Sequence, residues 1–171
     1  MDYFDIVDSR RSVRVFAQIP IEEHKIQKIL VTANRAPSAG NLQAYEIYVV
    51  RETSVRSALA HASLDQGFIA AAPIVLVFCA HPARSELRYR ERGIHLYAVQ
   101  DATIACTFAM LASTALGLSS VWVGAFDNEG VQNAICVPHT LLPVAILPIG
   151  YPAEEPEMRP RRKLNDIVHE I

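Results

Sequence analysis

Hydrophobic residues recur at the 3.6-residue spacing of a helix in several stretches of the chain. One stretch follows Pro20, where apolar residues from Ile26 to Ala33 fall on one face. A longer, more apolar stretch ends at Gly117, a residue typical of helix C-termini. Near the start, Asp2 is suited to cap a short helix. The pattern predicts helices over residues 2–9, 22–34, 54–63, 97–116 and 127–135.

Between these stretches the hydrophobic pattern changes to that of strands. Tyr45, Ile47 and Val49 alternate with their neighbours, and residues 73–79 form a continuous apolar, β-branched run typical of a buried central strand. The pattern predicts strands over residues 45–50, 73–79, 120–123 and 144–149. Residues 84–93 alternate in charge, which indicates either a solvated helix face or a lid.

The order of the predicted elements indicates the fold class. No internal repeat and no linker divides the chain, so residues 1–171 are expected to form a single domain. Helices come first, and strands then interleave with helices of unequal length, which favours an α+β fold. From Tyr151 onward the chain is Pro-rich, so we expect an extended tail with a turn of helix within residues 164–171.

Composition and charge narrow the function classes. The 171 residues are 51% hydrophobic and 20% charged, enough for a full core, and the net charge of -2 gives no global attraction to nucleic acid or acidic membranes. Residues 94–126 are very apolar, but Gln100 and Asp101 interrupt them. A buried core helix or a subunit interface is therefore favoured over a membrane span.

Cysteine usage indicates a reducing compartment. Cys79, Cys106 and Cys136 lie in apolar sequence surroundings and form no CxxC pair, so we expect three small buried hydrophobes rather than a disulfide framework. The acidic residues near the start do not resemble a signal peptide. Both observations predict a cytoplasmic protein.

The first chemically suggestive segment gathers Arg10, Arg11, Ser12 and Arg14. In an extended segment Arg10, Ser12 and Arg14 point to one face. Guanidinium forks and a hydroxyl suit a phosphate monoester, which needs several donors at fixed geometry. The alternative interpretation is a solvated basic stretch.

The second segment is the loop at residues 37–43. Ser38, Asn41 and Gln43 offer donors and acceptors, while Ala39 and Gly40 let a flat ligand approach closely. Amides of this kind match the carbonyls and ring nitrogens at the edge of a flavin. The alternative interpretation is a polar turn.

Two further segments could complete such a site. Val123, Gly124 and Ala125 end a predicted strand, where backbone N–H groups could approach a ring, although Trp122 beside them also suits the core. In the tail, a basic cluster could add guanidiniums to the same phosphate or simply be solvated. Its arginines are Arg159, Arg161 and Arg162.

Other catalytic patterns are missing from the sequence. There is no GxGxxG after the first predicted strand and no GxxxxGK[ST]. The six histidines are scattered without HExxH or other metal-ligand spacing, and there is no GxSxG. The sequence therefore predicts no metal site and no catalytic side chain, in agreement with chemistry carried by a cofactor.

In their order and spacing, the four segments make this chain resemble the FMN-dependent nitroreductase family. The resemblance extends over nearly the whole chain, including residues 96–101, 115–118 and 164–169. It implies an α/β/α sandwich with a central, mostly antiparallel sheet and non-covalent FMN at the interface of an intertwined homodimer. It also implies ping-pong hydride transfer, in which NADH or NADPH reduces FMN and a nitroaromatic, quinone or similar small acceptor takes the electrons.

The same resemblance assigns roles to residues. Arg10, Ser12 and Arg14 would hold the FMN phosphate, with Arg11 nearby and Arg161 joining from the tail, as would Arg159 or Arg162. Ser38, Asn41 and Gln43 would contact the isoalloxazine or ribityl chain, some of them from the second subunit. Val123, Gly124 and Ala125 would line the pyrimidine and N5 region.

Two departures from the family pattern concern the second substrate. Ala44 and Tyr45 follow Gln43 where many members have Pro-Trp, and the segment after the 73–79 strand is short. Three other interpretations stay open: a non-catalytic flavin-binding or sensing protein of the same fold, a specialised flavin-destroying or dehalogenating member, and a helical dimer whose basic segments are merely surface.

Overall fold

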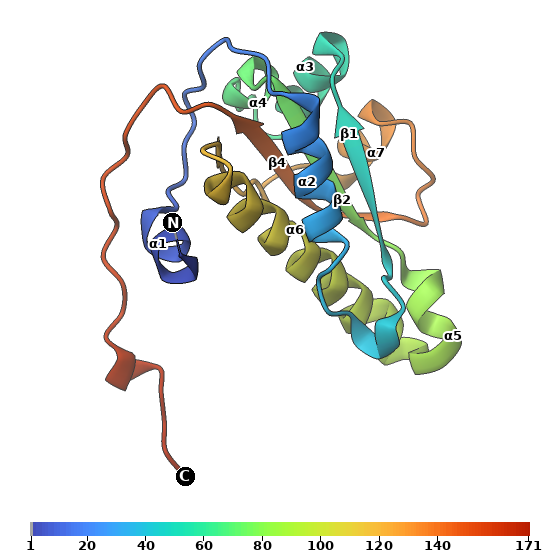
Figure 1. Ribbon diagram of the computed structural model, residues 1–171. Coiled ribbons are helices and arrows are strands. Elements are labelled where there is room, and N and C mark those ends of the chain that lie inside the picture. Colours follow the sequence, from blue (N-terminus) through green and yellow to red (C-terminus); the bar gives the residue numbers. More distant parts are fainter. Residues whose placement is uncertain (1) are drawn as a thin grey trace.

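The computed structural model describes residues 2–171 and has a four-stranded antiparallel sheet at its centre (Figure 1). The strands follow the order β1-β2-β4-β3. Their bounds are Tyr45–Val50 for β1, Ile74–Ala80 for β2, Ser119–Ser120 for β3 and Leu142–Gly150 for β4. β2 is buried along its whole length, as its continuous apolar run predicts.

Helices cover both faces of the sheet and create two hydrophobic cores. Alternate β2 residues point to opposite faces, so Leu76 and Phe78 pack with α2 and α6, whereas Val75 and Val77 pack with α3, α4 and α7. This is the α/β/α sandwich expected from the resemblance. The helices of the sandwich are α2 (Glu23–Ala33), α3 (Thr53–Ala62), α4 (Phe68–Ala71), α6 (Ala98–Ala115) and α7 (Asn128–Ala134).

The long helix α6 lies close to the sheet because small residues form its buried face. Its alanines at helical spacing are fully or almost fully buried, and they are Ala98, Ala102, Ala105, Ala109 and Ala112. By length and composition the helical run Pro82–Ala115 could cross a bilayer. In this structure α6 instead contacts β2 and β4, the position of a core helix.

A bent helical segment precedes α6. Helix α5 (Pro82–Arg92) contains Arg90 at φ 49°, and a π-helical turn, η2 (Gly93–Tyr97), joins it to α6. A Cβ atom on Gly93 would lie 2.5 Å from the carbonyl oxygen of Ser85, so the two turns can approach this closely only with glycine there. Residues 84–93 are thus mainly helical, one of the two expected alternatives.

Both ends of the chain lie on one side of the sandwich. α1 (Tyr3–Ser9) stands beside the C-terminal end of α6 (Figure 1). Asp2 is its N-cap, as expected, and also forms a capping box with Asp5. The tail leaves the sandwich after β4 and extends away with only a short 3-10 turn, η3 (Leu164–Asp166).

Three expectations need correction. The strand predicted at 120–123 is only two residues long, because after Ser120 the chain leaves β4 and rejoins it at a single bridge, Val123 to Ile146. The four-residue helix α4 was not predicted, since one turn is too short to show a period. Cys136 is exposed after α7, unlike the buried Cys79 and Cys106.

Candidate functional site

The segment containing Arg10, Ser12 and Arg14 runs extended along the sheet edge. Ser12 bridges Ser120 of β3 in parallel, and the Val13 N–H donates to the Ser120 carbonyl at 3.3 Å. Val13 is 2% exposed and anchors the segment in the core. With Val13 pointing inward, its polar neighbours are left at the surface.

The start of the tail pairs with the same segment. The Ala153 N–H donates to the Val15 carbonyl and the Ala17 N–H donates to the Tyr151 carbonyl, both at 2.9 Å. A carboxylate oxygen of Glu154 accepts from the backbone N–H groups of Arg14 and Val15, the latter at 3.0 Å. Two segments about 140 residues apart in sequence are thereby held together.

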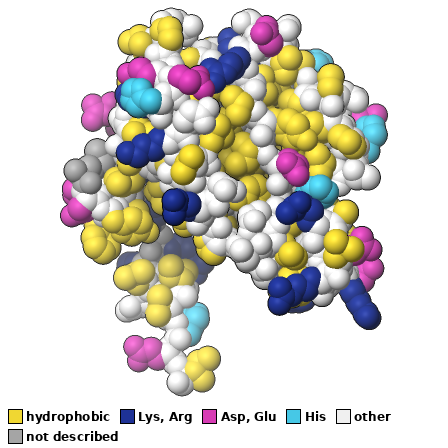
Figure 2. All heavy atoms as spheres, turned by 45° about the vertical axis from the view of Figure 1, so that its right-hand side comes forward, with side chains coloured by type: hydrophobic (Ala, Val, Ile, Leu, Met, Phe, Trp, Pro, Cys, Tyr) yellow, Lys and Arg dark blue, Asp and Glu magenta, His cyan; other side chains and the backbone are white. Residues whose placement is uncertain are grey.

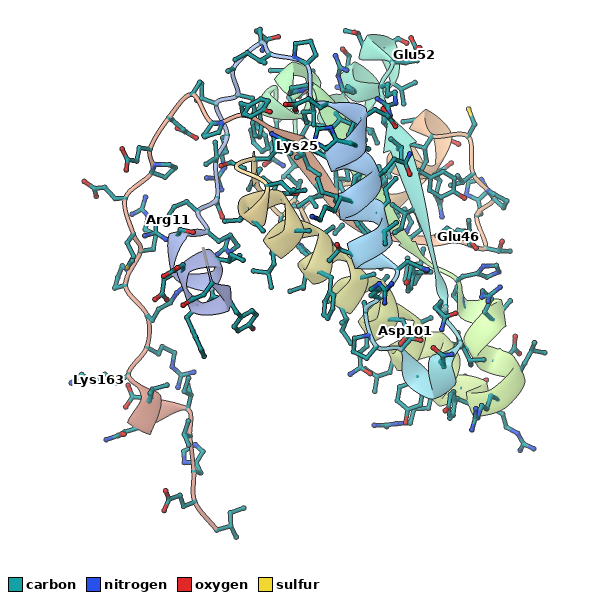
Figure 3. The ribbon with its side chains drawn as sticks, in the orientation of Figure 1. Arg11, Lys25, Glu46, Glu52, Asp101 and Lys163 are labelled. Carbon is teal, nitrogen blue, oxygen red and sulfur yellow. The ribbon has the colours of Figure 1, made fainter. Side chains whose placement is uncertain are left out.

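An arginine-rich cleft of about 610 Å³ lies between these two segments. Its lining includes Arg10, Arg11, Ser12, Arg14, Arg159 and Arg161, together with Glu154 and Glu157. Figure 3 shows Arg11 beside α1, facing the side on which the tail passes. Arg162 is not part of the lining, because its Nη2 donates to the Asp166 carbonyl within the tail at 2.6 Å.

The cleft concentrates positive charge. Burial, reinforced by the charges of Arg161 and Arg11, lowers the pKa of Arg10 below its ordinary value. Within residues 2–171 none of the arginines in the cleft is in a salt bridge. A bound phosphate would relieve this repulsion and accept charge-assisted hydrogen bonds, so the cleft fits the phosphate end of a flavin mononucleotide.

The loop carrying Ser38, Asn41 and Gln43 is built around a buried carboxylate. Asp101, 2% exposed on the first turn of α6, accepts from the N–H of Ala39 at 2.9 Å and from the N–H of Ala44 at 3.2 Å. The two hydrogen bonds clamp both ends of the loop to the start of α6. In the sequence Asp101 stood out as an interruption of an apolar stretch and as the end of the 96–101 segment, but its role as an acceptor for the loop was not predicted.

Inside the loop the polar side chains bind one another. Gln43 donates from its backbone N–H to Ser38 Oγ at 3.0 Å and from Nε2 to Asn41 Oδ1 at 2.6 Å. The loop includes the 3-10 turn η1 (Ala39–Asn41), and Gly40, Asn41 and Gln43 have φ values of 57°, 57° and 43°. Non-glycine residues with positive φ are uncommon and cluster at binding sites.

The two sets of candidate ligands lie at opposite ends of α6. Asp101 holds the loop at the beginning of the helix, whereas Thr114 near its end lines a cleft together with Arg10 and Arg11. Thirteen residues at 1.5 Å each separate them by roughly 20 Å. Figure 3 shows Arg11 and Asp101 far apart on opposite sides of the structure. Within one chain, the Arg10–Arg14 segment and the Ser38–Gln43 loop therefore do not form one site.

The third predicted group lies next to β4. Val123 is 3% exposed, and its N–H donates to the Ile146 carbonyl at 2.9 Å, so it has no free donor for a ring. Within residues 2–171 the N–H groups of Gly124 and Ala125 form no hydrogen bond. Gln66 holds the Ala125 carbonyl at 3.4 Å.

Comparisons with known proteins agree with this architecture. The model of the Nitroreductase family matches residues 7–67 and 52–151, and the chain belongs to this family. It is 32% identical to an NADH dehydrogenase of Thermus thermophilus, covering 93% of this chain and 91% of that protein. It is 29% identical to a putative NADH dehydrogenase/NAD(P)H nitroreductase of Methanothermobacter thermautotrophicus, covering 93% and 82%.

Solved structures show the same fold. The NADPH:FMN oxidoreductase from Vibrio harveyi complexed with NAD+ superimposes with a TM-score of 0.90 at 25% identity, covering 98% of this chain and 76% of that one. Nitroreductase A from Vibrio parahaemolyticus superimposes with a TM-score of 0.91 at 26% identity, covering 99% and 76%.

Proposed function

We propose that this protein is an FMN-dependent NAD(P)H oxidoreductase that passes electrons to a nitroaromatic, quinone or similar small acceptor. The observation that carries the proposal is the arginine-rich cleft on the extended Arg10–Arg14 segment, in a chain whose relatives include an oxygen-insensitive NADPH nitroreductase, an NADPH-flavin oxidoreductase and an FMN reductase. A cleft whose guanidiniums form no salt bridge within residues 2–171 matches the one strongly charged group of FMN.

A homodimer would complete the site. Because the two sets of ligands lie at opposite ends of α6, a second copy packed antiparallel to the first would bring its Ser38–Gln43 loop to the Arg10–Arg14 segment. An apolar groove of about 390 Å³ lies between α1 and α6. Its lining includes Tyr3, Ile6, Phe108, Leu111 and Leu116. Apolar tail residues such as Leu164, 71% exposed, also lack cover within the chain.

In this dimer each part of the chain has a definite task. The arginines and Ser12 hold the phosphate, and the partner's loop presents Ser38, Asn41 and Gln43 to the ring edge. The free N–H groups of Gly124 and Ala125 are the remaining candidates for contact with the ring. FMN, when bound, would supply the hydride chemistry. No side chain needs to act as an acid or base.

The proposal is tested first by absorbance spectra of the purified protein, before and after anaerobic addition of NADH or NADPH. Flavin bands that bleach with either donor support the oxidoreductase. Bands that persist with both support the alternative, a flavin-binding or sensing protein. A protein that stays colourless after incubation with FMN contradicts flavin binding altogether.

The shared site is tested by mixing two variants. Arg10→Gln damages the phosphate cleft, whereas Asn41→Ala damages the loop. If each site takes one set from each subunit, a mixed dimer has one intact site and one site with both defects. At an FMN concentration too low to load either variant alone, subunit exchange between the two variants should give mixed dimers with up to half of the wild-type activity. Sites within single chains predict no such recovery.

A further inference from the structure

Helix α5 carries an arginine stripe that the proposed flavin site does not use. Its residues are Arg84 and Arg88, one turn apart on one side of α5, and Arg92, which follows the bend at Arg90. Figure 2 shows dark blue Lys and Arg side chains gathered on the lower part of the molecule, where α5 lies in Figure 1. Arg84 and Arg88 contact the Ser38–Gln43 loop, whereas Arg92 contacts Tyr97 of η2.

The contacts of the stripe are all to neutral acceptors. Arg84 donates to the Leu42 carbonyl from Nε at 3.2 Å and from Nη2 at 3.0 Å, and Arg88 donates to the Gly40 carbonyl at 3.5 Å. Arg92 donates from Nε to the Tyr97 hydroxyl at 2.9 Å. Over residues 2–171 no carboxylate lies within ion-pair distance of these arginines. Three positive charges are thus held in place without a counter-charge.

Aromatic rings accompany the charges. Tyr89 and Tyr97 form an edge-to-face pair with centroids 5.0 Å apart. Arg88 lies over the Tyr89 ring at 5.5 Å and Arg92 over the Tyr97 ring at 5.3 Å. A surface that combines guanidiniums with aromatic rings suits a ligand with both a phosphate and a flat base.

We propose that Arg84, Arg88 and Arg92 recognise the 2′-phosphate of NADPH and make this protein prefer NADPH to NADH. The inference rests on the proposed function, in which the loop beneath α5 touches the flavin. Because Arg84 and Arg88 contact this loop, a dinucleotide with its nicotinamide at the flavin would have its adenosine half within reach of α5. There the tyrosines can stack against adenine and the arginines can bind the phosphate.

The 2′-phosphate fits the stripe better than the pyrophosphate does. A phosphate monoester carries about −1.5 to −2 charges at neutral pH, whereas each phosphate of the pyrophosphate has one ester and one anhydride linkage and carries a single charge. In other dinucleotide-binding folds an arginine likewise accommodates the 2′-phosphate. A stripe of three unpaired guanidiniums has the charge that such a dianion requires.

The test compares both donors in an Arg88→Gln/Arg92→Gln double variant, which keeps both hydrogen bonds from Arg84 to the loop and removes only the 3.5 Å contact of Arg88 with the Gly40 carbonyl. Arg51→Gln is the matched control, because Arg51 lies beyond the far end of β1 and pairs with Glu23. We expect KM for NADPH to rise by about tenfold or more, with kcat unchanged and NADH kinetics changed by less than about threefold. Adenosine 2′,5′-bisphosphate should likewise lose affinity in the double variant, whereas 5′-ADP should not.

One result would overturn the inference: an unchanged NADPH to NADH ratio of kcat/KM, whether neither donor is affected or both lose equally. The flavin content of each variant and its reduction by NADH report separately on the proposed function. A double variant that keeps its flavin and its NADH activity but shows no selective loss with NADPH rejects only the role of the stripe. A wild-type protein without flavin rejects the proposed function itself.

Discussion

Replacing Arg10 with Gln separates cofactor binding from folding stability. The Arg10 side chain has no hydrogen bond or ion pair within residues 2–171, and burial together with the charges of Arg161 and Arg11 already disfavours its positive charge. Removing this charge should therefore leave the apoprotein as stable as before or slightly more so. FMN should nevertheless bind more weakly, because the phosphate loses a guanidinium donor.

The size of the loss follows from the burial of Arg10. Hydrogen bonds to charged groups contribute about 1.5–3 kcal/mol. Arg10 is only partly buried, so we take a value of about 2 kcal/mol, which corresponds to a roughly 30-fold increase in the FMN dissociation constant. Quenching of flavin fluorescence measures this constant, and thermal unfolding of the apoprotein measures stability.

Riboflavin provides the internal control, since it lacks the phosphate. Its affinity should be the same in wild type and Arg10→Gln, and Arg51→Gln should alter neither ligand. A change in FMN affinity below about threefold, or an equal change for riboflavin, would show that the phosphate lies elsewhere.

Four other predictions concern the clamp, the interface, pH dependence and thiol reactivity. Asp101→Ala leaves two loop N–H groups without an acceptor and should lower the free energy of unfolding in urea by about 2–4 kcal/mol, whereas a loss below about 0.5 kcal/mol would contradict the clamp. Leu111→Glu in the apolar groove should yield a protein that is monomeric by light scattering and lacks flavin absorbance; a flavin-loaded dimer would reject this interface. The Tyr151 hydroxyl donates to Glu22 and lowers the pKa of that carboxyl, so stability from this bond is present above the unfolded pKa of about 4.3 and is lost as pH falls through the lower folded pKa. Tyr151→Phe should thus be less stable than wild type near neutrality, with the difference shrinking in acid, and a constant difference would refute the linkage. At pH 8 a thiol reagent should modify Cys136 alone in the native protein and three thiols after denaturation, because burial raises the pKa of the other two, and more than one native thiol would contradict their burial.

Much of the fold was predictable because its signals are local. The alternation of Tyr45, Ile47 and Val49 identified β1 with its observed bounds, and the apolar run at residues 73–79 identified the central strand to within one residue. Short elements were harder to predict from the sequence. β3 depends on pairing with β4, a partner more than 20 residues away in sequence, and periodicity carries no information about such pairing.

Most residues that line the arginine-rich cleft could be singled out from the sequence, whereas their arrangement could not. Charge and amide content were enough to single out Arg10 and Asn41, yet nothing in the spacing says that they lie at opposite ends of α6. Glu154 was also missed, because its contact with the Arg14–Val15 backbone joins two distant parts of the chain. The arginines at residues 84–92 were noticed only as alternating charge.

The distance between the two sets of ligands depends on the length of α6, and this restricts how the chain can vary. One inserted residue would lengthen the helix by about 1.5 Å and turn its end by about 100°. Either the buried alanines of α6 would lose contact with the sheet, or Asp101 would lose its hydrogen bonds to the loop. Between Asp101 and Thr114, insertions and deletions should therefore be excluded even where substitutions on the outer face are tolerated.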